Sequence, residues 1–131
     1  DALQFYGKNL GLTFQIADDT LDYNSNLNLF GKKIGKDFFE GKVTLPAILV
    51  YQQSNINEKE LLKKIFKQTK RNEEDFKIML KLISKYNIVD QCYKKAGYFI
   101  NLASNSLSIF KPSREKNILE NLISFSLERS F

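Results

Sequence analysis

The sequence predicts an all-α protein. Apolar residues recur at intervals of three and four along most of the 131 residues, which is the spacing that places side chains on one face of a helix. No stretch alternates apolar and polar residues for long, as half-buried strands would. Asparagine, threonine or serine precedes several of the apolar runs and supplies helix start signals. With a hydrophobic fraction of 43%, the chain is long enough for one core, so we expect a single helical domain over residues 1–131.

The first predicted helix leads into a long connection. The apolar periodicity predicts a helix over residues 2–23, on positions Leu3, Tyr6, Leu10, Phe14, Ala17 and Leu21. Asparagines, glycines and charges then break the pattern and predict a loop with one short turn over residues 24–42. Because long loops in compact domains are uncommon unless they carry function, this connection is a candidate functional segment.

Five further helices are predicted from their start signals. Thr44 and Pro46 suit the cap and first turn of a helix over residues 45–53. Asn57 with Glu60 has the spacing of a capping box and predicts the start of the next helix.

The C-terminal half continues in the same way. Asn72 predicts the start of a helix, residues 88–109 form a long one, and Pro112 with Ser113 opens the last. We expect the apolar side chains of the last helix to be mostly buried: Ile118, Leu119, Leu122, Ile123, Phe125 and Leu127.

Composition excludes several kinds of chemistry. The net charge of +5 is spread along the helices rather than gathered in one arm, so nucleic-acid binding is not expected. With no histidine and one cysteine, the chain has no intrachain disulfide, no imidazole metal ligand and no histidine-activated nucleophile. Cys92 falls in an apolar pattern and is predicted to be a core residue in a reducing compartment. No apolar run approaches the roughly 20 residues of a membrane span.

Three carboxylates gather at the end of the first predicted helix. At about 100° per residue, Gln15, Asp18, Asp19 and Asp22 share one helical face. Close carboxylates repel one another unless a cation neutralises them, and Mg²⁺ is commonly held by one or two carboxylates, waters and phosphate oxygens. The pattern therefore predicts a Mg²⁺ site that binds a diphosphate. The alternative is a polar helix end followed by a solvated loop.

Lysines and glycines follow the carboxylates. Gly31, Gly35 and Gly41 allow the backbone to bend and to approach an anion. A calcium-binding loop does not fit, since Leu27 and Lys33 occupy the positions that require glycine and glutamate when counted from Asp22. The basic residues of this segment are Lys32, Lys33, Lys36 and Lys42.

The order and spacing of these residues resemble the second aspartate-rich region of the trans-polyprenyl diphosphate synthases, especially the long-chain branch. The matching positions are Phe14, Gln15, Asp18, Asp19, Asp22, Gly31, Lys32, Gly35, Asp37, Glu40, Gly41, Lys42, Thr44, Leu45 and Pro46, with Pro112, Ser113, Arg114 and Arg129 near the end. The resemblance runs along the whole chain but covers only the C-terminal part of the family. It implies the C-terminal portion of an isoprenoid-synthase-type helical bundle.

The resemblance implies a prenyltransferase that condenses isopentenyl diphosphate with an allylic diphosphate after Mg²⁺-assisted ionisation. Asp18 is the first choice for a direct metal ligand. Asp19 and Asp22 are implied as direct or water-mediated ligands, or as residues that orient the ligands, and the three aspartates form the catalytic set. Gln15 lies beside the allylic group.

Lysines and one arginine are implied to bind substrate. Lys42, with either Lys32 or Lys33, contacts the allylic diphosphate, and Arg129 reaches isopentenyl diphosphate. The first aspartate-rich motif lies upstream in the family, so we expect the chain to be inactive alone and to need a homodimer or a partner chain that carries this motif.

Two alternatives stay open: a non-catalytic subunit of a heteromeric prenyl synthase, and a terpene cyclase fragment. The resemblance to the long-chain branch also implies an enzyme of quinone side-chain synthesis, and the cysteine usage suits a cytoplasmic location.

Overall fold

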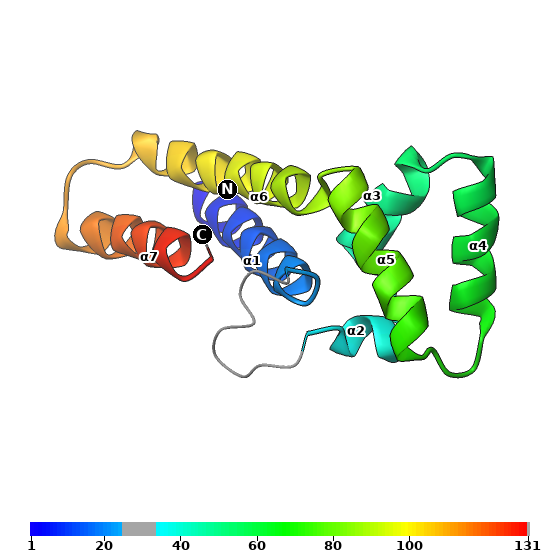
Figure 1. The fold of residues 1–131 in the computed structure, drawn as a ribbon. Coiled ribbons are helices and arrows are strands. Elements are labelled where there is room, and N and C mark those ends of the chain that lie inside the picture. The colour runs from blue at the N-terminus through cyan, green and yellow to red at the C-terminus, as the bar shows by residue number, and fades with distance from the viewer. Residues whose placement is uncertain (25–33, 131) are drawn as a thin grey trace. The chain divides into compact units, whose positions relative to one another are not determined.

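The computed structural model describes residues 1–24 and 34–130, with side chains as far as Ser126. Helices account for all regular structure in these residues (Figure 1). None of them combines the length and hydrophobicity that a membrane span requires. The all-α prediction is confirmed. The elements are α1 Ala2–Leu21, α2 Lys36–Phe39, α3 Leu45–Gln53, α4 Ile56–Lys67, α5 Glu73–Lys85, α6 Ile88–Ser106, a 3₁₀ turn Leu107–Ile109 and α7 Arg114–Ser130.

Most predicted starts are confirmed, and one is wrong. Asn72 caps α5 by accepting a hydrogen bond from the backbone N–H of Asp75, at the predicted position. Helix α4, however, is capped by Asn55 rather than Asn57. The same asparagine-to-glutamate spacing occurs two residues earlier, where the Glu58 carboxylate accepts from the Asn55 N–H and also from Lys85 and Tyr86 of the α5 end. These tertiary partners favour the earlier start.

The chain divides into two compact units, which are residues 1–18 with 93–131, and residues 19–92. We describe each unit by itself. The prediction of one domain over residues 1–131 stays a prediction.

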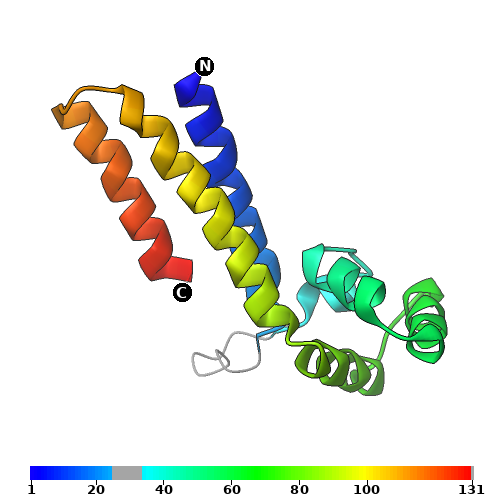
Figure 2. The same ribbon diagram turned by 90° about the horizontal axis from the view of Figure 1, so that it is seen from above.

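In the first unit, α1, α6 and α7 lie side by side (Figures 1 and 2). The hydroxyl of Tyr6 in α1 donates to the carbonyl of Leu119 in α7 at 2.6 Å, and the hydroxyl of Thr13 in α1 lies 3.3 Å from the carbonyl of Ala96 in α6. These hydrogen bonds join the helices around an apolar core, which is formed by Tyr6, Leu10, Ile100, Ala103, Leu107 and Ile123.

The expectation for α7 is wrong in part. Ile123 is buried, whereas Ile118, Leu122 and Phe125 are exposed by 52%, 42% and 56%. Only the stripe that contains Leu119 and Ile123 faces the core, because a helix packed on one side buries about one face.

In the second unit, α3 packs against α4 and α5. Aromatic rings fill the space around α2: Phe38 lies 5.5 Å from Phe66 and 5.2 Å from Phe76 between ring centroids. Cys92 is fully buried, which confirms its predicted place in a core. The apolar packing holds the short α2 against the longer α4 and α5.

Candidate functional site

The acidic face at the end of α1 is less uniform than its spacing suggests. Gln15 and Asp18 are exposed, whereas Asp19 is only 8% exposed. Asp22 directly follows α1 and is half-buried. Of the three aspartates, Asp18 therefore offers the most accessible carboxylate.

Asp22 holds the start of α2. Its Oδ1 accepts hydrogen bonds from the backbone N–H groups of Gly35 at 3.1 Å and Lys36 at 3.0 Å. Its Oδ2 accepts a third from the N–H of Asp37 at 2.7 Å. The first N–H groups of a helix have no partner within the helix, and one carboxylate satisfies them here. Asp22 therefore orients the segment that leads to the lysine-bearing turn.

Gly35 is required by this arrangement. Its φ of 94° lies in the left-handed region, where residues with a Cβ are strained. A Cβ at this position would also lie 2.7 Å from Cζ of Phe76. The backbone thus passes directly over an aromatic ring of α5.

Arg71 fastens the other end of α2. Its Nε donates to the carbonyl of Phe38 at 2.8 Å, and its Nη1 donates to the carbonyl of Gln68 at 2.7 Å. The guanidinium thereby links the end of α2 with the residue that follows α4. Gly41, with φ 74°, passes so close that an added Cβ would lie 2.7 Å from Nη2 of Arg71.

Lys42 follows this tethered turn. Its backbone N–H donates to the carbonyl of Asp37 at 2.8 Å, and the residue is exposed. The turn is therefore held by its backbone while the ammonium group faces solvent.

Neighbouring carboxylates affect the pKa values of two groups in this region. Burial, followed by the neighbouring Asp22 carboxylate, raises the pKa of Asp37, whereas Lys42 lowers it. Tyr23 is fully buried, and burial followed by the charges of Asp22, Asp37 and Asp19 raises its pKa. Burial is the largest cause of both shifts, and the nearby carboxylates raise both pKa values further.

The donor chemistry suits a hard divalent cation, although no ready-made cage is present. Across residues 1–24 and 34–130, no group of three or more Asp, Glu, Cys or His side chains is arranged to hold a metal ion. Mg²⁺ does not require such a cage, since it takes one or two carboxylates and fills its shell with waters and phosphate oxygens. Asp18 fits that use, while three backbone N–H groups already occupy Asp22.

Three predicted substrate-binding residues lie outside the described positions. These are Lys32 and Lys33 in the segment 25–33, and the side chain of Arg129 near the end of α7.

Sequence reasoning missed Arg71 and Phe76, which hold α2 in place. Arg71 is one of only a few arginines in a chain whose cations are mostly lysines. An arginine in a chain rich in lysine was an available signal, because the guanidinium group can donate to several carbonyls at once. Phe76 gave no signal beyond its place in an apolar pattern.

Within this helical fold, an aspartate-rich helix end precedes a tethered turn that carries Lys42. Residues 1–83 match the family model for polyprenyl synthetase, and the chain belongs to that family.

Curated and solved relatives agree with this assignment. The octaprenyl diphosphate synthase of Haemophilus influenzae is 31% identical over 99% of this chain and 39% of its own length. A decaprenyl diphosphate synthase structure from Rhodobacter capsulatus superposes with a TM-score of 0.89 at 28% identity, over 99% of this chain and 40% of that one.

A polyprenyl synthase from Caulobacter crescentus, complexed with calcium and isoprenyl diphosphate, gives a TM-score of 0.83 at 35% identity. It matches over 99% of this chain and 40% of its own. The chain thus spans about two fifths of the length of these relatives.

Proposed function

We propose that this chain supplies one metal-binding wall of a prenyltransferase that condenses isopentenyl diphosphate with an allylic diphosphate into a long-chain trans-polyprenyl diphosphate. The single observation that carries the proposal is the exposed Asp18 near the end of α1, four residues before Asp22, whose carboxylate anchors the turn that leads to Lys42. The octaprenyl and decaprenyl synthases among the relatives support the long-chain product.

The three aspartates have different tasks in this proposal. Asp18 holds Mg²⁺ directly, because its carboxylate is exposed. Asp22 keeps α2 in position and acts on the metal site through that placement. Asp19, being buried, adds negative charge and helps to orient the end of α1.

Cationic and amide groups then bind the substrates. Lys42 contacts the allylic diphosphate from the tethered turn, together with Lys32 or Lys33. Gln15, exposed on α1 one turn before Asp18, lies beside the allylic group. Arg129 binds isopentenyl diphosphate.

The chemistry is electrostatic. Mg²⁺ held at Asp18 would supply positive charge against the leaving diphosphate, which would lower the barrier to ionisation. Of the chain's own residues, Asp18 would hold that cation and Lys42 would contact the allylic diphosphate. They supply no nucleophile.

Prenyl transfer also requires a second aspartate-rich wall. We propose that it comes from further sequence or from a partner chain, in a homodimer or a heteromeric enzyme, and that these 131 residues alone do not turn over substrate. A cytoplasmic location and a role in quinone side-chain synthesis belong to the same proposal.

The first test is Mg²⁺-dependent binding of inorganic diphosphate to the 131-residue chain, measured by calorimetry. Asp18→Asn should abolish the Mg²⁺-dependent part, while Asp90→Asn, an exposed acid in the first turn of α6, should leave it unchanged. Equal binding by the Asp18→Asn variant would refute the metal role.

Activity separates the catalytic proposal from that of a non-catalytic subunit. In an assembled synthase that incorporates labelled isopentenyl diphosphate onto farnesyl diphosphate, Asp18→Ala should abolish incorporation. Unchanged incorporation would assign the chain a purely structural role, and cyclic hydrocarbon products would indicate a terpene cyclase.

A further inference from the structure

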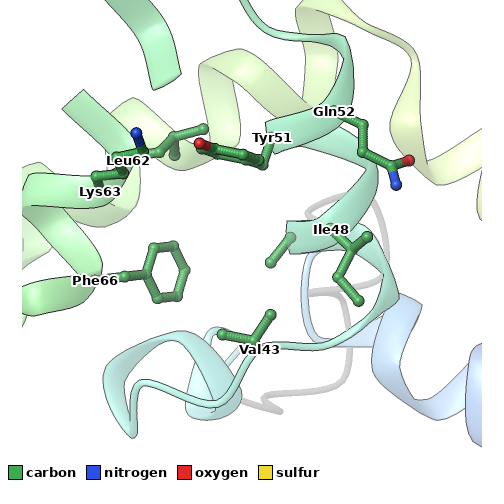
Figure 3. A pocket seen from close by; sticks show the side chains of 8 residues that line it. Val43, Ile48, Tyr51, Gln52, Leu62, Lys63 and Phe66 are labelled. Carbon is green, nitrogen blue, oxygen red and sulfur yellow. The ribbon is translucent and has the colours of Figure 1, made fainter. Parts of the chain in front are cut away.

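An apolar groove lies between α3 and α4 within the second unit (Figure 3). Its volume is about 450 Å³. Its walls carry Val43, Ala47 and Ile48 on one side and Leu62 and Phe66 on the other. Ligand pockets of roughly 300 to 1,000 Å³ with mostly apolar walls are typical of small-molecule sites.

Two of these apolar side chains are exposed to solvent. Val43 is 62% exposed and Ile48 is 42% exposed, although both border a concave surface. Burying them under an apolar ligand would remove that surface from water, which is favourable in proportion to its area. Binding of a hydrocarbon chain in the groove is therefore favourable.

One end of the groove is cationic. Lys63 lines it beside Tyr51. The ammonium of Lys59 lies 5.5 Å from the centroid of the Tyr51 ring. Lys63 also borders a second, shallower hollow that contains Lys64 and Lys67.

The lining contains no carboxylate. Glu60 borders only the neighbouring hollow and pairs with Lys63 at 3.5 Å. An anionic head group placed at Lys63 would contact the ammonium directly, in place of Glu60. This distinguishes the groove from the aspartate-rich end of α1.

We propose that this groove binds a prenyl diphosphate, with the isoprenoid chain along the apolar walls and the diphosphate at Lys63. The inference rests on the proposed function for the choice of ligand, because a prenyl diphosphate is the amphiphile that such an enzyme consumes and releases. The groove differs from the metal-binding aspartates in sequence position and chemistry, so it would hold substrate or product without turning it over.

The test is calorimetric titration of the 131-residue chain with farnesyl diphosphate in EDTA, so that no divalent ion can bridge the diphosphate to aspartates. We expect saturable binding. The double variant Val43→Ser/Ile48→Ser should weaken it about tenfold or more, because two apolar contacts are lost. Ile56→Ser removes an equally apolar side chain that is 79% exposed outside the groove, and it should change nothing.

The contact between Lys63 and the diphosphate is tested with one variant and one control. Lys63→Met should weaken farnesyl diphosphate binding up to about fivefold, as expected for an exposed ion pair, and should leave farnesol binding unchanged. Lys77→Met is the control, because Lys77 forms the same kind of pair with Glu74, at 3.4 Å, away from the groove. Circular dichroism should show equal helix content and equal melting temperatures for all variants.

Three results would overturn the proposal. They are absence of saturable binding in EDTA, equal affinity of the Val43→Ser/Ile48→Ser variant, and loss of the EDTA binding in Asp18→Asn. The last would assign the binding to the aspartate-rich site. The proposed function is tested by a different experiment, the Mg²⁺-dependent binding of inorganic diphosphate. It would fail there if the Asp18→Asn variant bound as well as the parent.

Discussion

The carboxylate of Asp22 accepts a hydrogen bond from the backbone N–H of Asp37 at 2.7 Å, across fifteen residues of sequence. Two more backbone N–H groups, from Gly35 and Lys36, donate to the same carboxylate. An aspartate that reads as a metal ligand in the sequence thus serves as the anchor of the following helix. Asp18 and Asp22 therefore have different structural environments, and their substitutions should have different effects.

Asp22→Asn should destabilise the chain by about 1–3 kcal/mol, because it removes a charged acceptor from three hydrogen bonds. Urea unfolding followed by circular dichroism measures the loss, and hydrogen exchange should accelerate at Gly35, Lys36 and Asp37. The control, Asp18→Asn, changes an exposed residue and should stay within about 0.5 kcal/mol of the parent. Equal stability of the two variants would contradict the anchoring role.

Gly35→Ala should lower stability by about 1–3 kcal/mol, because alanine is strained at a φ of 94° and its Cβ would meet the Phe76 ring. Gly7→Ala is the opposite case, since a Cβ in this helical position meets nothing within 4 Å. It should stabilise the chain by about 0.5–1 kcal/mol. Thermal unfolding of the two variants tests both signs, and a neutral Gly35→Ala would show that the turn relaxes easily.

Arg71→Lys should loosen the turn that carries Lys42. Lysine keeps the charge but lacks the planar fork that reaches the carbonyls of Phe38 and Gln68 together. We expect faster proteolysis near Gly41 and a loss of about 1–2 kcal/mol in unfolding free energy. Lys70→Met alters an exposed neighbour and should leave both measurements unchanged. Resistance to proteolysis equal to the parent would rule out the fastening role.

Glu58 should make stability depend on acid. The Lys85 ammonium, the Tyr86 hydroxyl and the backbone N–H of Asn55 lower its pKa from 4.5 to about 2. Because the folded state holds the charged form more strongly, this stabilisation is complete above pH 4.5 and is lost as the pH falls from there through about 2.

Glu58→Gln should therefore lower the melting temperature at neutral pH and flatten its dependence between pH 4.5 and about 2. Glu60→Gln is the control, because the Glu60 side chain is 69% exposed and pairs with its helical neighbour Lys63. If both variants keep the parent's acid dependence, the Glu58 cluster does not contribute to it.

The sequence by itself determined the helical class, most helix boundaries and the candidate chemistry. Helix α3 spans the predicted residues 45–53, and Asn72 caps α5 where its pattern indicated. These features depend on local spacing and capping, which are written within a few consecutive residues. The order of aspartates, glycines and lysines likewise identified the family that the comparison confirmed.

Only the tertiary structure decided which of several equivalent local signals is used. Asn55 caps α4 instead of Asn57 because Glu58 finds partners at the end of α5. Asp22 becomes an anchor because its carboxylate meets three backbone N–H groups at the start of α2. Such choices depend on contacts between residues far apart in the chain, and helical periodicity carries no information about those contacts.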